Sequence, residues 1–256
     1  MTDKENKASS HHESFEEEVV RNIEALGSDS VLASLSRKWI EGGVPNKYSY
    51  NFSWLGVPIV QYPQDIIALQ EIIWRTRPEI IVETGIARGG SLIFFASLLE
   101  LIGGPGHVVG IDIDIRENNR SRIEAHPLFK RISLIQGSSI DPKVVVEVGR
   151  IAKEKRTMIV LDSDHSHRHV LTELISYSPF VSRGCYLVVL DTIIEDLPDQ
   201  MFLNRPWGRG NNPKTAVQEF LARTQDFEVD NSIPNKLLIT VAPDGYLVRL
   251  KMKSNG

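Results

Sequence analysis

Residues 79–91 read EIIVETGIARGGS, and this stretch decides the fold. The apolar run EIIVETG is typical of a buried strand, and the run SLIFFASLLELIG that follows is typical of a buried helix. Between them a glycine-rich turn extends from Glu83 to Ser91, where glycines let the backbone bend sharply and Ser91 can cap the helix. The turn has neither the GxGxxG pattern of dinucleotide-binding turns nor the GKS or GKT ending of a P-loop. The stretch predicts a strand–turn–helix unit whose turn binds a ligand.

Strand-like and helix-like runs continue to alternate after this unit. Apolar strand runs lie at residues 107–114, 131–138, 157–164 and 184–192, and helical runs lie at 118–127, 141–155, 169–181 and 213–225. Strands with uncharged middles that are separated by helices indicate a parallel sheet covered on both faces. We therefore predict an α/β fold with a Rossmann-like, doubly wound and mostly parallel sheet. The last segments, 227–230 and 236–250, look like a hairpin with its turn at Pro243-Asp244-Gly245.

The chain ahead of the sheet divides into two parts. Residues 1–14 are polar and acidic, which predicts a disordered leader. Within residues 15–62, apolar side chains recur at three- and four-residue steps and are interrupted at Gly27, which predicts an N-terminal helical extension. A long connection with aromatic residues completes this extension. A helical run to residue 78 opens the sheet domain, which we place at residues 63–256.

Composition narrows the class of protein. The 256 residues suit one domain with an extension, and the net charge of −4 argues against a nucleic-acid partner. The single cysteine, Cys185, cannot form an internal disulfide, and no apolar run reaches the ~20 residues that a membrane span requires. We expect a cytoplasmic protein without a membrane span. The N-terminal helices and the aromatic stretch 48–54 could bury the interface of a homo-oligomer.

Side chains at the strand ends indicate the cofactor. Glu83 disfavours a diphosphate and suits a cationic ligand such as S-adenosylmethionine, which carries an amino group and a sulfonium. Asp112 follows the second strand about twenty residues after the turn, where a carboxylate can accept both ribose hydroxyls. Ser138 follows the third strand, in a loop that would lie along the edge of the adenine ring. The alternative is a structural glycine turn with Asp112 as a solvated strand end. The expected cofactor-binding residues are Glu83, Gly85, Arg88, Gly89, Ser91, Asp112, Ser138 and Asp162.

Asp162 and Asp191 follow the fourth and fifth strands and predict a metal site. Neighbouring strand tips can bring both carboxylates together, and two close carboxylates favour a cation between them. Oxygen ligands with room for water suit Mg²⁺, which can hold a substrate hydroxyl and lower its pKa. His165 is then placed as the general base, so Asp162 and His165 are the expected catalytic residues.

An iron site is a weaker alternative for the same segment. Asp162 with His165, His167 and His169 could supply two histidines and one carboxylate. Iron oxygenases of that type usually place these ligands inside a β-barrel, whereas this chain alternates strands and helices. We therefore interpret His167 and His169 as surface residues at the start of a helix.

From Trp54 to Arg249 the sequence resembles the cephalosporin hydroxylase/rhamnosyl O-methyltransferase family. The motifs that carry the resemblance occur in order along the chain: SWLGVPIVQYPQDIIALQEII, RPEIIVETGIARGGS, GHVVGIDIDIR, LIQGSSID, LDSDHSHRHVLTEL, YLVVLDT, RPWGRGNNPKTAVQEFL and GYLVR. The resemblance implies a class I, metal-dependent O-methyltransferase that uses S-adenosylmethionine, with residues 63–256 as its methyltransferase domain.

The resemblance also assigns individual residues. It places Glu83, Gly85 and Ser91 in the cofactor turn, Asp112 at the ribose, Asp162 and Asp191 at the metal, and His165 at the position of a catalytic histidine. One departure concerns the metal, because relatives carry two adjacent acids where this chain has Leu190-Asp191. Asp164 and Glu195 are the candidates to replace the missing acid.

The expected function is metal-assisted methyl transfer to a hydroxyl of a small metabolite, such as a sugar of a glycosylated natural product or lipid. The first alternative is a non-catalytic cofactor-binding partner of an oxidoreductase, which Leu190 favours, and the second is an NAD-dependent oxidoreductase. The glycine- and proline-containing segment 205–210 is either a lid over the acceptor, with Trp207 stacked on it, or a surface loop.

Overall fold

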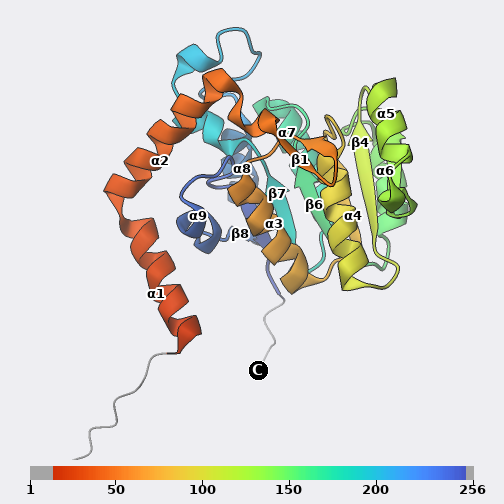
Figure 1. Cartoon of the computed structure of the whole chain (residues 1–256), viewed down its shortest axis with the longest axis horizontal. Coiled ribbons are helices and arrows are strands. Elements are labelled where there is room, and N and C mark those ends of the chain that lie inside the picture. The colour runs from red at the N-terminus through yellow and green to blue at the C-terminus, as the bar shows by residue number, and fades with distance from the viewer. Residues whose placement is uncertain (1–13, 252–256) are drawn as a thin grey trace, which may run out of the picture.

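A seven-stranded sheet forms the centre of the computed structural model, which describes residues 14–251. The strand order is β5-β4-β3-β6-β7-β9-β8 (Figure 1). Strands β3 to β7 run parallel, and β9 is antiparallel to both of its neighbours. The predicted doubly wound, mostly parallel fold is confirmed. The strands are β3 (Ile80–Thr84), β4 (His107–Asp112), β5 (Ile132–Gln136), β6 (Thr157–Leu161), β7 (Tyr186–Val189), β8 (Phe227–Val229) and β9 (Tyr246–Arg249).

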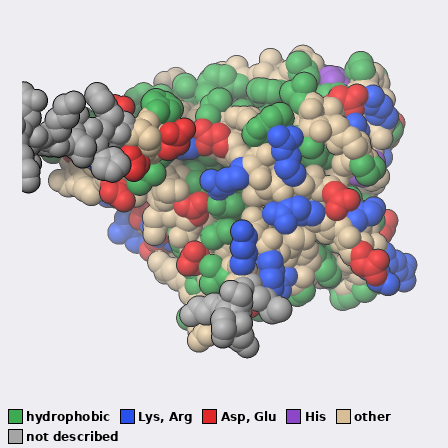
Figure 2. All heavy atoms as spheres, turned by 90° about the horizontal axis from the view of Figure 1, so that it is seen from below, with side chains coloured by type: hydrophobic (Ala, Val, Ile, Leu, Met, Phe, Trp, Pro, Cys, Tyr) green, Lys and Arg blue, Asp and Glu red, His purple; other side chains and the backbone are tan. Residues whose placement is uncertain are grey.

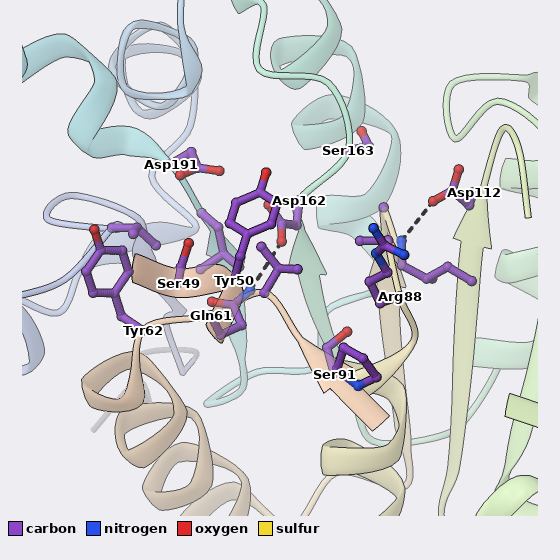
Figure 3. A pocket seen from close by; sticks show the side chains of 18 of the residues that line it. Ser49, Tyr50, Gln61, Tyr62, Arg88, Ser91, Asp112, Asp162, Ser163 and Asp191 are labelled. Atoms are coloured by element: carbon purple, nitrogen blue, oxygen red, sulfur yellow. Dashed lines mark hydrogen bonds between the residues drawn. The ribbon is translucent and has the colours of Figure 1, made fainter. Parts of the chain in front are cut away.

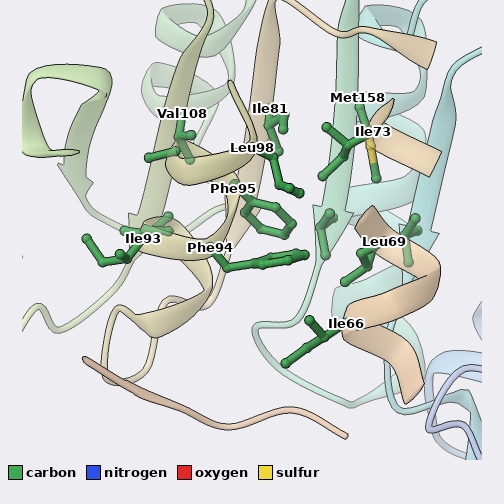
Figure 4. Packing of buried hydrophobic residues seen from close by; sticks show 14 of the residues in the cluster. Ile66, Leu69, Ile73, Ile81, Ile93, Phe94, Phe95, Leu98, Val108 and Met158 are labelled. Atoms are coloured by element: carbon green, nitrogen blue, oxygen red, sulfur yellow. The ribbon is translucent and has the colours of Figure 1, made fainter. Parts of the chain in front are cut away.

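Helices cover both faces of the sheet. On one face, α3 (Pro63–Thr76), α4 (Gly90–Ile102) and α5 (Glu117–Glu124) bury apolar side chains against it. Figure 4 shows this layer, in which Leu69 of α3 and Phe94 and Phe95 of α4 pack beside Ile81 and Met158 of the strands. On the other face lie α6 (Pro142–Ala152), α7 (His167–Tyr177) and α8 (Pro213–Arg223). Because burying one such side chain contributes roughly 1.5–3 kcal/mol, these two layers hold the strand ends in place.

The C-terminal segment differs from the predicted hairpin. Residues 232–237 form helix α9 (Ser232–Leu237), and β9 then inserts between β7 and β8, so that Val248 pairs with both Tyr186 and Glu228. The turn at Pro243-Asp244-Gly245 therefore does not join two strands of a hairpin. The cause is the buried Asp65, whose carboxylate accepts hydrogen bonds from the Val241 backbone and the Thr240 hydroxyl. The bond to Asp65 occupies the Val241 amide, a donor that a strand at this position would use to pair with its neighbour.

The N-terminal extension consists of two helices and a small hairpin. Helices α1 (Phe15–Ser28) and α2 (Ser30–Gly43) form an arm beside the body, with α1 close to α9 (Figure 1). The predicted break at Gly27 is wrong, because α1 continues through it and Asp29 separates the helices by capping α2. Short 3₁₀ turns, η1 (Val44–Asn46) and η2 (Tyr48–Asn51), lead to the hairpin of β1 (Phe52–Trp54) and β2 (Val57–Ile59).

Two predictions about the ends of the domain remain open. The expected leader lies outside the described residues except for Ser14, which caps α1. The domain boundary at residue 63 stays a prediction. The β1–β2 hairpin, which precedes that boundary, packs against α4 of the sheet domain through Trp54 and Phe94, whose ring centroids are 4.9 Å apart. Across residues 14–251, no helix combines the length and the apolar character that crossing a membrane demands.

Candidate active site

The turn between β3 and α4 folds tightly against the neighbouring strand loop. Gly85 has φ +81°, and a Cβ there would lie 2.0 Å from the Asp162 carbonyl oxygen. Gly89 has φ +87° and would meet the Ile123 side chain at 2.4 Å. Both positions therefore require glycine for space as well as for conformation. This close packing fixes the path of the turn at the carboxyl end of the sheet.

Glu83 lies beneath the turn and is almost fully buried, with 1% of its surface exposed. Ser91 donates its hydroxyl proton to Glu83 Oε2 at 2.8 Å. The prediction that Ser91 caps α4 is wrong, because Gly89 occupies the N-cap position and no side chain bonds there. Burial raises the pKa of Glu83 to about 8, and the Ser91 hydrogen bond partly opposes this effect. A nearby cation would favour the charged form of Glu83.

Asp112 lies at the end of β4 and steadies the same turn. Its Oδ2 accepts the Ile86 amide at 3.0 Å, and its Oδ1 accepts the Asp114 amide at 3.0 Å. Each carboxylate oxygen keeps a further lone pair for a ligand hydroxyl. The position is therefore compatible with the predicted contact to a ribose.

Asp162, His165 and Asp191 come together as predicted. One ligand atom from each lies within 4.8 Å of the others, and His165 Nδ1 is 3.5 Å from Asp191 Oδ2. Burial raises the pKa of Asp162 well above its usual value, and Asp191 and Glu83 add to this rise. Asp191 has a left-handed backbone with φ +56°, a conformation that few residues other than glycine, Asn and Asp adopt. Within residues 14–251, this cluster is the one group of three or more histidine, cysteine or acidic side chains whose spacing would allow them to hold a metal ion.

Gln61 is a site residue that the sequence reasoning missed. It lies between β2 and α3, is 6% exposed, and donates from Nε2 to Asp162 Oδ2 at 3.2 Å. Figure 3 shows this bond beside Tyr50 and Asp191. The neighbouring Tyr62 is also buried. Gln61 stands inside one of the quoted family motifs, but no local pattern marks it as functional.

Two adjoining cavities meet at this edge of the sheet. The first has a volume of about 340 Å³ and contains the metal-ligating cluster, with Gln61, Ser49 and Tyr50 in its wall. The second, of about 350 Å³, is lined by residues that include Ser138 and Trp207. Both cavities share Gly85, Asp112 and Ser163.

The predicted cofactor residues divide between the two cavities. The first cavity is lined by five of them, Gly85, Arg88, Ser91, Asp112 and Asp162, and the second by Ser138 together with Gly85 and Asp112. Glu83 lies beneath the wall through its bond to Ser91, and Gly89 packs on Ile123. Their role in binding a cofactor stays a prediction.

His167 and His169 lie in the first turn of α7, as predicted, but their side chains are partly buried and not exposed at the surface. His169 Nε2 lies 3.1 Å from the hydroxyls of Ser139 and Ser163, and it is 3.6 Å from the buried Glu173. His167 contacts Thr215 and Glu219 of α8, each at 2.8 Å. Both side chains are therefore half-buried, and neither joins Asp162 in the cluster that a two-histidine iron site would need.

Neither candidate for the missing acid reaches the cluster. Asp164 accepts hydrogen bonds from the Ser166 amide at 2.7 Å and from its hydroxyl at 2.5 Å. Glu195 accepts from the Gly210 amide at 2.7 Å and from the Asn212 side chain. Leu190 itself is buried and lines the first cavity.

Trp207 brings the segment 205–210 onto the site. Its ring lies edge-on to the His165 imidazole, with centroids 4.9 Å apart and planes at 81°. It also lines the second cavity. Trp207 thus contributes the contact of this segment with His165 and part of the wall of the second cavity.

Comparisons with known proteins agree on one family. The family model described as Rhamnosyl O-methyltransferase/CmcI matches residues 46–250. A rhamnosyl O-methyltransferase of Mycobacterium bovis (strain BCG / Pasteur 1173P2) is 31% identical over 226 residues, which cover 87% of this chain and 86% of that protein. A rhamnosyl O-methyltransferase of Mycobacterium leprae (strain TN) is 30% identical over 221 residues, which cover 85% and 90%.

Solved structures agree on the fold. An apo structure of CmcI has a TM-score of 0.56 at 22% identity and covers 79% of this chain and 77% of its own. A CmcI structure described as a Mg–SAM complex has a TM-score of 0.55 at 20% identity and covers 79% and 78%. At such identities the likeness establishes the shared architecture.

Proposed function

Because the chain belongs to the rhamnosyl O-methyltransferase/CmcI family, we propose that it transfers a methyl group from S-adenosylmethionine to a hydroxyl of a small metabolite, with help from a divalent metal. One observation carries the proposal: Asp162, His165 and Asp191 gather within 4.8 Å, in a cavity whose wall includes the β3–α4 turn. A base and a metal-ligating pair thus lie beside the predicted cofactor turn. The acceptor is a sugar of a glycosylated natural product or lipid.

The two cavities suit the two parts of the cofactor. Ser138 in the second cavity would edge the adenine, and Asp112, at the junction, would accept hydrogen bonds from the ribose. The methionine portion would then point into the first cavity, above Gly85, Arg88 and Gly89. The buried Glu83 supports a cationic ligand there, because the side chain that hydrogen-bonds to it within residues 14–251 is the neutral Ser91 hydroxyl.

The residues around Asp162 fit a divalent cation. Asp162 accepts a hydrogen bond from Gln61, and the nearby Asp191 and its own burial make its charged form unfavourable without a cation. Asp162 and Asp191 would hold Mg²⁺, which prefers oxygen ligands. When bound, the metal supplies a positive charge that lowers the pKa of an acceptor hydroxyl.

His165 performs the proton transfer in the proposed mechanism. Asp191, 3.5 Å from Nδ1, orients the imidazole, which takes the proton of the acceptor hydroxyl. The acceptor oxygen attacks the methyl carbon, the carbon–sulfur bond breaks, and its electron pair remains on sulfur. The products are a methyl ether and S-adenosylhomocysteine. The walls of the cavity contribute by holding the reactants in line.

The wall opposite the turn supports a sugar as the acceptor. Ser49, Tyr50 and Tyr62 reach the first cavity from the N-terminal extension. Aromatic faces and hydroxyls together suit a ring that has both apolar faces and hydroxyl groups.

A small molecule suits the chain as a partner better than a nucleic acid. The net charge is −4, and on the face seen from below in Figure 2, away from the cavities, Lys and Arg side chains lie among Asp and Glu side chains. Binding of phosphate chains needs clustered positive charge. The buried, unpaired Cys185 supports a reducing, cytoplasmic location.

A second candidate function rests on Leu190. Because this residue stands where an acid is expected, the chain would bind S-adenosylmethionine without catalysing transfer, as a partner of an oxidoreductase. Calorimetry with Mg²⁺ separates the two: cofactor binding without metal binding would favour this candidate.

A screen of hydroxylated metabolites with a labelled methyl donor tests the main proposal. We expect label to reach glycosylated compounds in the presence of Mg²⁺ and to fall at least tenfold when a chelator is added. Failure to label any sugar-containing acceptor would contradict the proposal.

A further inference from the structure

We propose that the side-chain amide oxygen of Gln61 is a metal ligand that takes the place of the acid absent at Leu190. The proposal rests on the proposed metal-assisted function and deepens it, because it assigns a ligand from the N-terminal extension to the site on the sheet. Gln61 lines the first cavity together with Asp162, His165 and Asp191.

The first argument is the amide oxygen of Gln61. Its Oε1 is buried and has no hydrogen-bond partner among residues 14–251, and the whole residue is only 6% exposed. A buried polar atom without a partner destabilises a fold, and a bound ion would give this oxygen the partner that it lacks. The cavity beside it holds the carboxylates of Asp162 and Asp191, and a half-turn of the amide would bring this oxygen to face them, where a bound cation would satisfy it.

The second argument is the distance to Asp162. Gln61 Nε2 lies 3.2 Å from Asp162 Oδ2. A half-turn of the amide group exchanges its nitrogen and oxygen, so Oε1 can occupy the same position. Two oxygens bound at right angles to Mg²⁺, each at 2.0–2.1 Å, lie about 3 Å apart. The separation therefore suits two neighbouring ligands of one ion.

The third argument is the rigidity of the segment that carries Gln61. The neighbouring Ile59 and Tyr62 are buried, and a Cβ at Gly90 would lie 2.3 Å from the Pro58 carbonyl oxygen. The segment is thus pressed directly onto the start of α4. A ligand held by packed neighbours needs little reorganisation when the metal binds.

A single side chain can serve the site with and without the metal. Without the metal, the amide nitrogen of Gln61 donates a hydrogen bond to the Asp162 carboxylate. With the metal bound, the amide would turn so that its oxygen faces the cation. Because Leu190 supplies no ligand atom, one coordination position of the metal stays free for the neutral amide oxygen of Gln61. The site would then carry one negative charge fewer than a site with three acids.

Calorimetric titration of the full-length protein with Mn²⁺ tests the proposal through binding alone. We expect Gln61→Met, which removes the oxygen at similar length, to weaken Mn²⁺ binding at least tenfold, and Gln61→Glu to strengthen it at least tenfold. Gln64→Met is the matched control, because Gln64 Oε1 is also buried without a partner but lies outside the cavity, and its affinity should stay within twofold. Unchanged affinity in Gln61→Met would overturn the proposal.

A second readout separates a ligand from a residue that merely steadies Asp162. Pulsed EPR of the Cu²⁺-loaded Gln61→His protein should detect one imidazole more than the wild type, because a histidine there reaches the ion. An equal number of imidazoles in both proteins would show that position 61 lies out of reach and would overturn the assignment. Methyl transfer is measured separately. Metal-dependent product with unchanged Mn²⁺ affinity in Gln61→Met would contradict this inference alone, and metal binding without labelled product would contradict the proposed function alone.

Discussion

At the scale of the single residue, Glu83 links the site to the stability of the fold. Burial raises its pKa from 4.5 to about 8, so between these values the folded protein keeps a proton that the unfolded chain has released. Stability contributed by this group therefore falls as pH rises from about 4.5 to about 8, by at most ~1.4 kcal/mol per pH unit, and changes no further above that window.

We expect Glu83→Gln to remove this contribution, because an amide accepts the Ser91 hydroxyl but does not ionise. Urea unfolding from pH 5 to pH 8.5 should show the variant gaining stability relative to wild type as pH rises. The difference in unfolding free energy between wild type and variant reports on Glu83 alone, because Asp65 and Asp162, whose pKa values burial also raises, are present in both proteins. The exposed Glu147→Gln variant is the control, and parallel curves for wild type and Glu83→Gln would contradict the assignment.

His165 carries the second prediction at this scale. If it is the general base, His165→Gln should lower the rate of methyl transfer roughly 10²–10⁴-fold. Affinity for S-adenosylmethionine, measured by calorimetry, should change little, since the predicted cofactor residues other than Asp162 lie on other segments of the chain. His167→Gln serves as the control because its ring bonds to Thr215 and Glu219, away from the cavities. A His165→Gln enzyme with wild-type turnover would exclude the mechanism.

At the scale of the element, the β3–α4 turn depends on space as much as on backbone angle. Gly56 and Gly85 share a positive φ, but nothing lies within 4 Å of a Cβ at Gly56, whereas one at Gly85 would strike the Asp162 carbonyl oxygen. Gly56→Ala should cost roughly 1–2 kcal/mol, the usual penalty for that conformation.

Gly85→Ala should cost about 2 kcal/mol more than Gly56→Ala, because the loop that carries Asp162 must also move. Urea unfolding measures the difference, and a metal titration should show weaker binding in Gly85→Ala alone. Equal losses of stability in the two variants would indicate that the crowding at Gly85 is relieved without moving the loop.

The elements also show how far the sequence leads. Apolar runs with polar ends were sufficient to place five strands, and so to bring Asp112, Asp162 and Asp191 to one edge of the sheet. The apolar run around residue 238 fits either a strand or a helix and loop, and a contact with the distant Asp65 decides between them. Gln61 could not be identified from the sequence for a similar reason, because its place in the site depends on a contact with Asp162, 101 residues away.

At the scale of the whole molecule, the arm of α1 and α2 presents apolar side chains to solvent. Phe15, Val20, Val31 and Leu35 are each more than half exposed, and of the two helices' residues only Ile40 is buried. A surface of this kind favours association with another apolar surface. We expect the protein to self-associate through this arm.

Analytical ultracentrifugation over a range of concentrations tests this expectation. The wild type should sediment as an oligomer at micromolar concentration, and the double variant Val31→Glu/Leu35→Glu should sediment as a smaller species. Val146→Glu, at an exposed apolar position on α6, is the control and should leave the oligomer intact. A wild type that remains monomeric at high concentration would rule out the arm as a self-association surface.

The place of β9 has a consequence for how the protein is made. Because β9 lies between β7 and β8, Tyr186 on β7 finds its partner Val248 only after more than sixty further residues have been synthesised. A nascent chain that has already left the ribosome as far as β8 therefore exposes the open edge of β7, which is apolar and prone to pair with other chains. The interval of greatest aggregation risk lies between the synthesis of β8 and that of β9, and chaperone capture in this interval would protect the yield more than faster early folding.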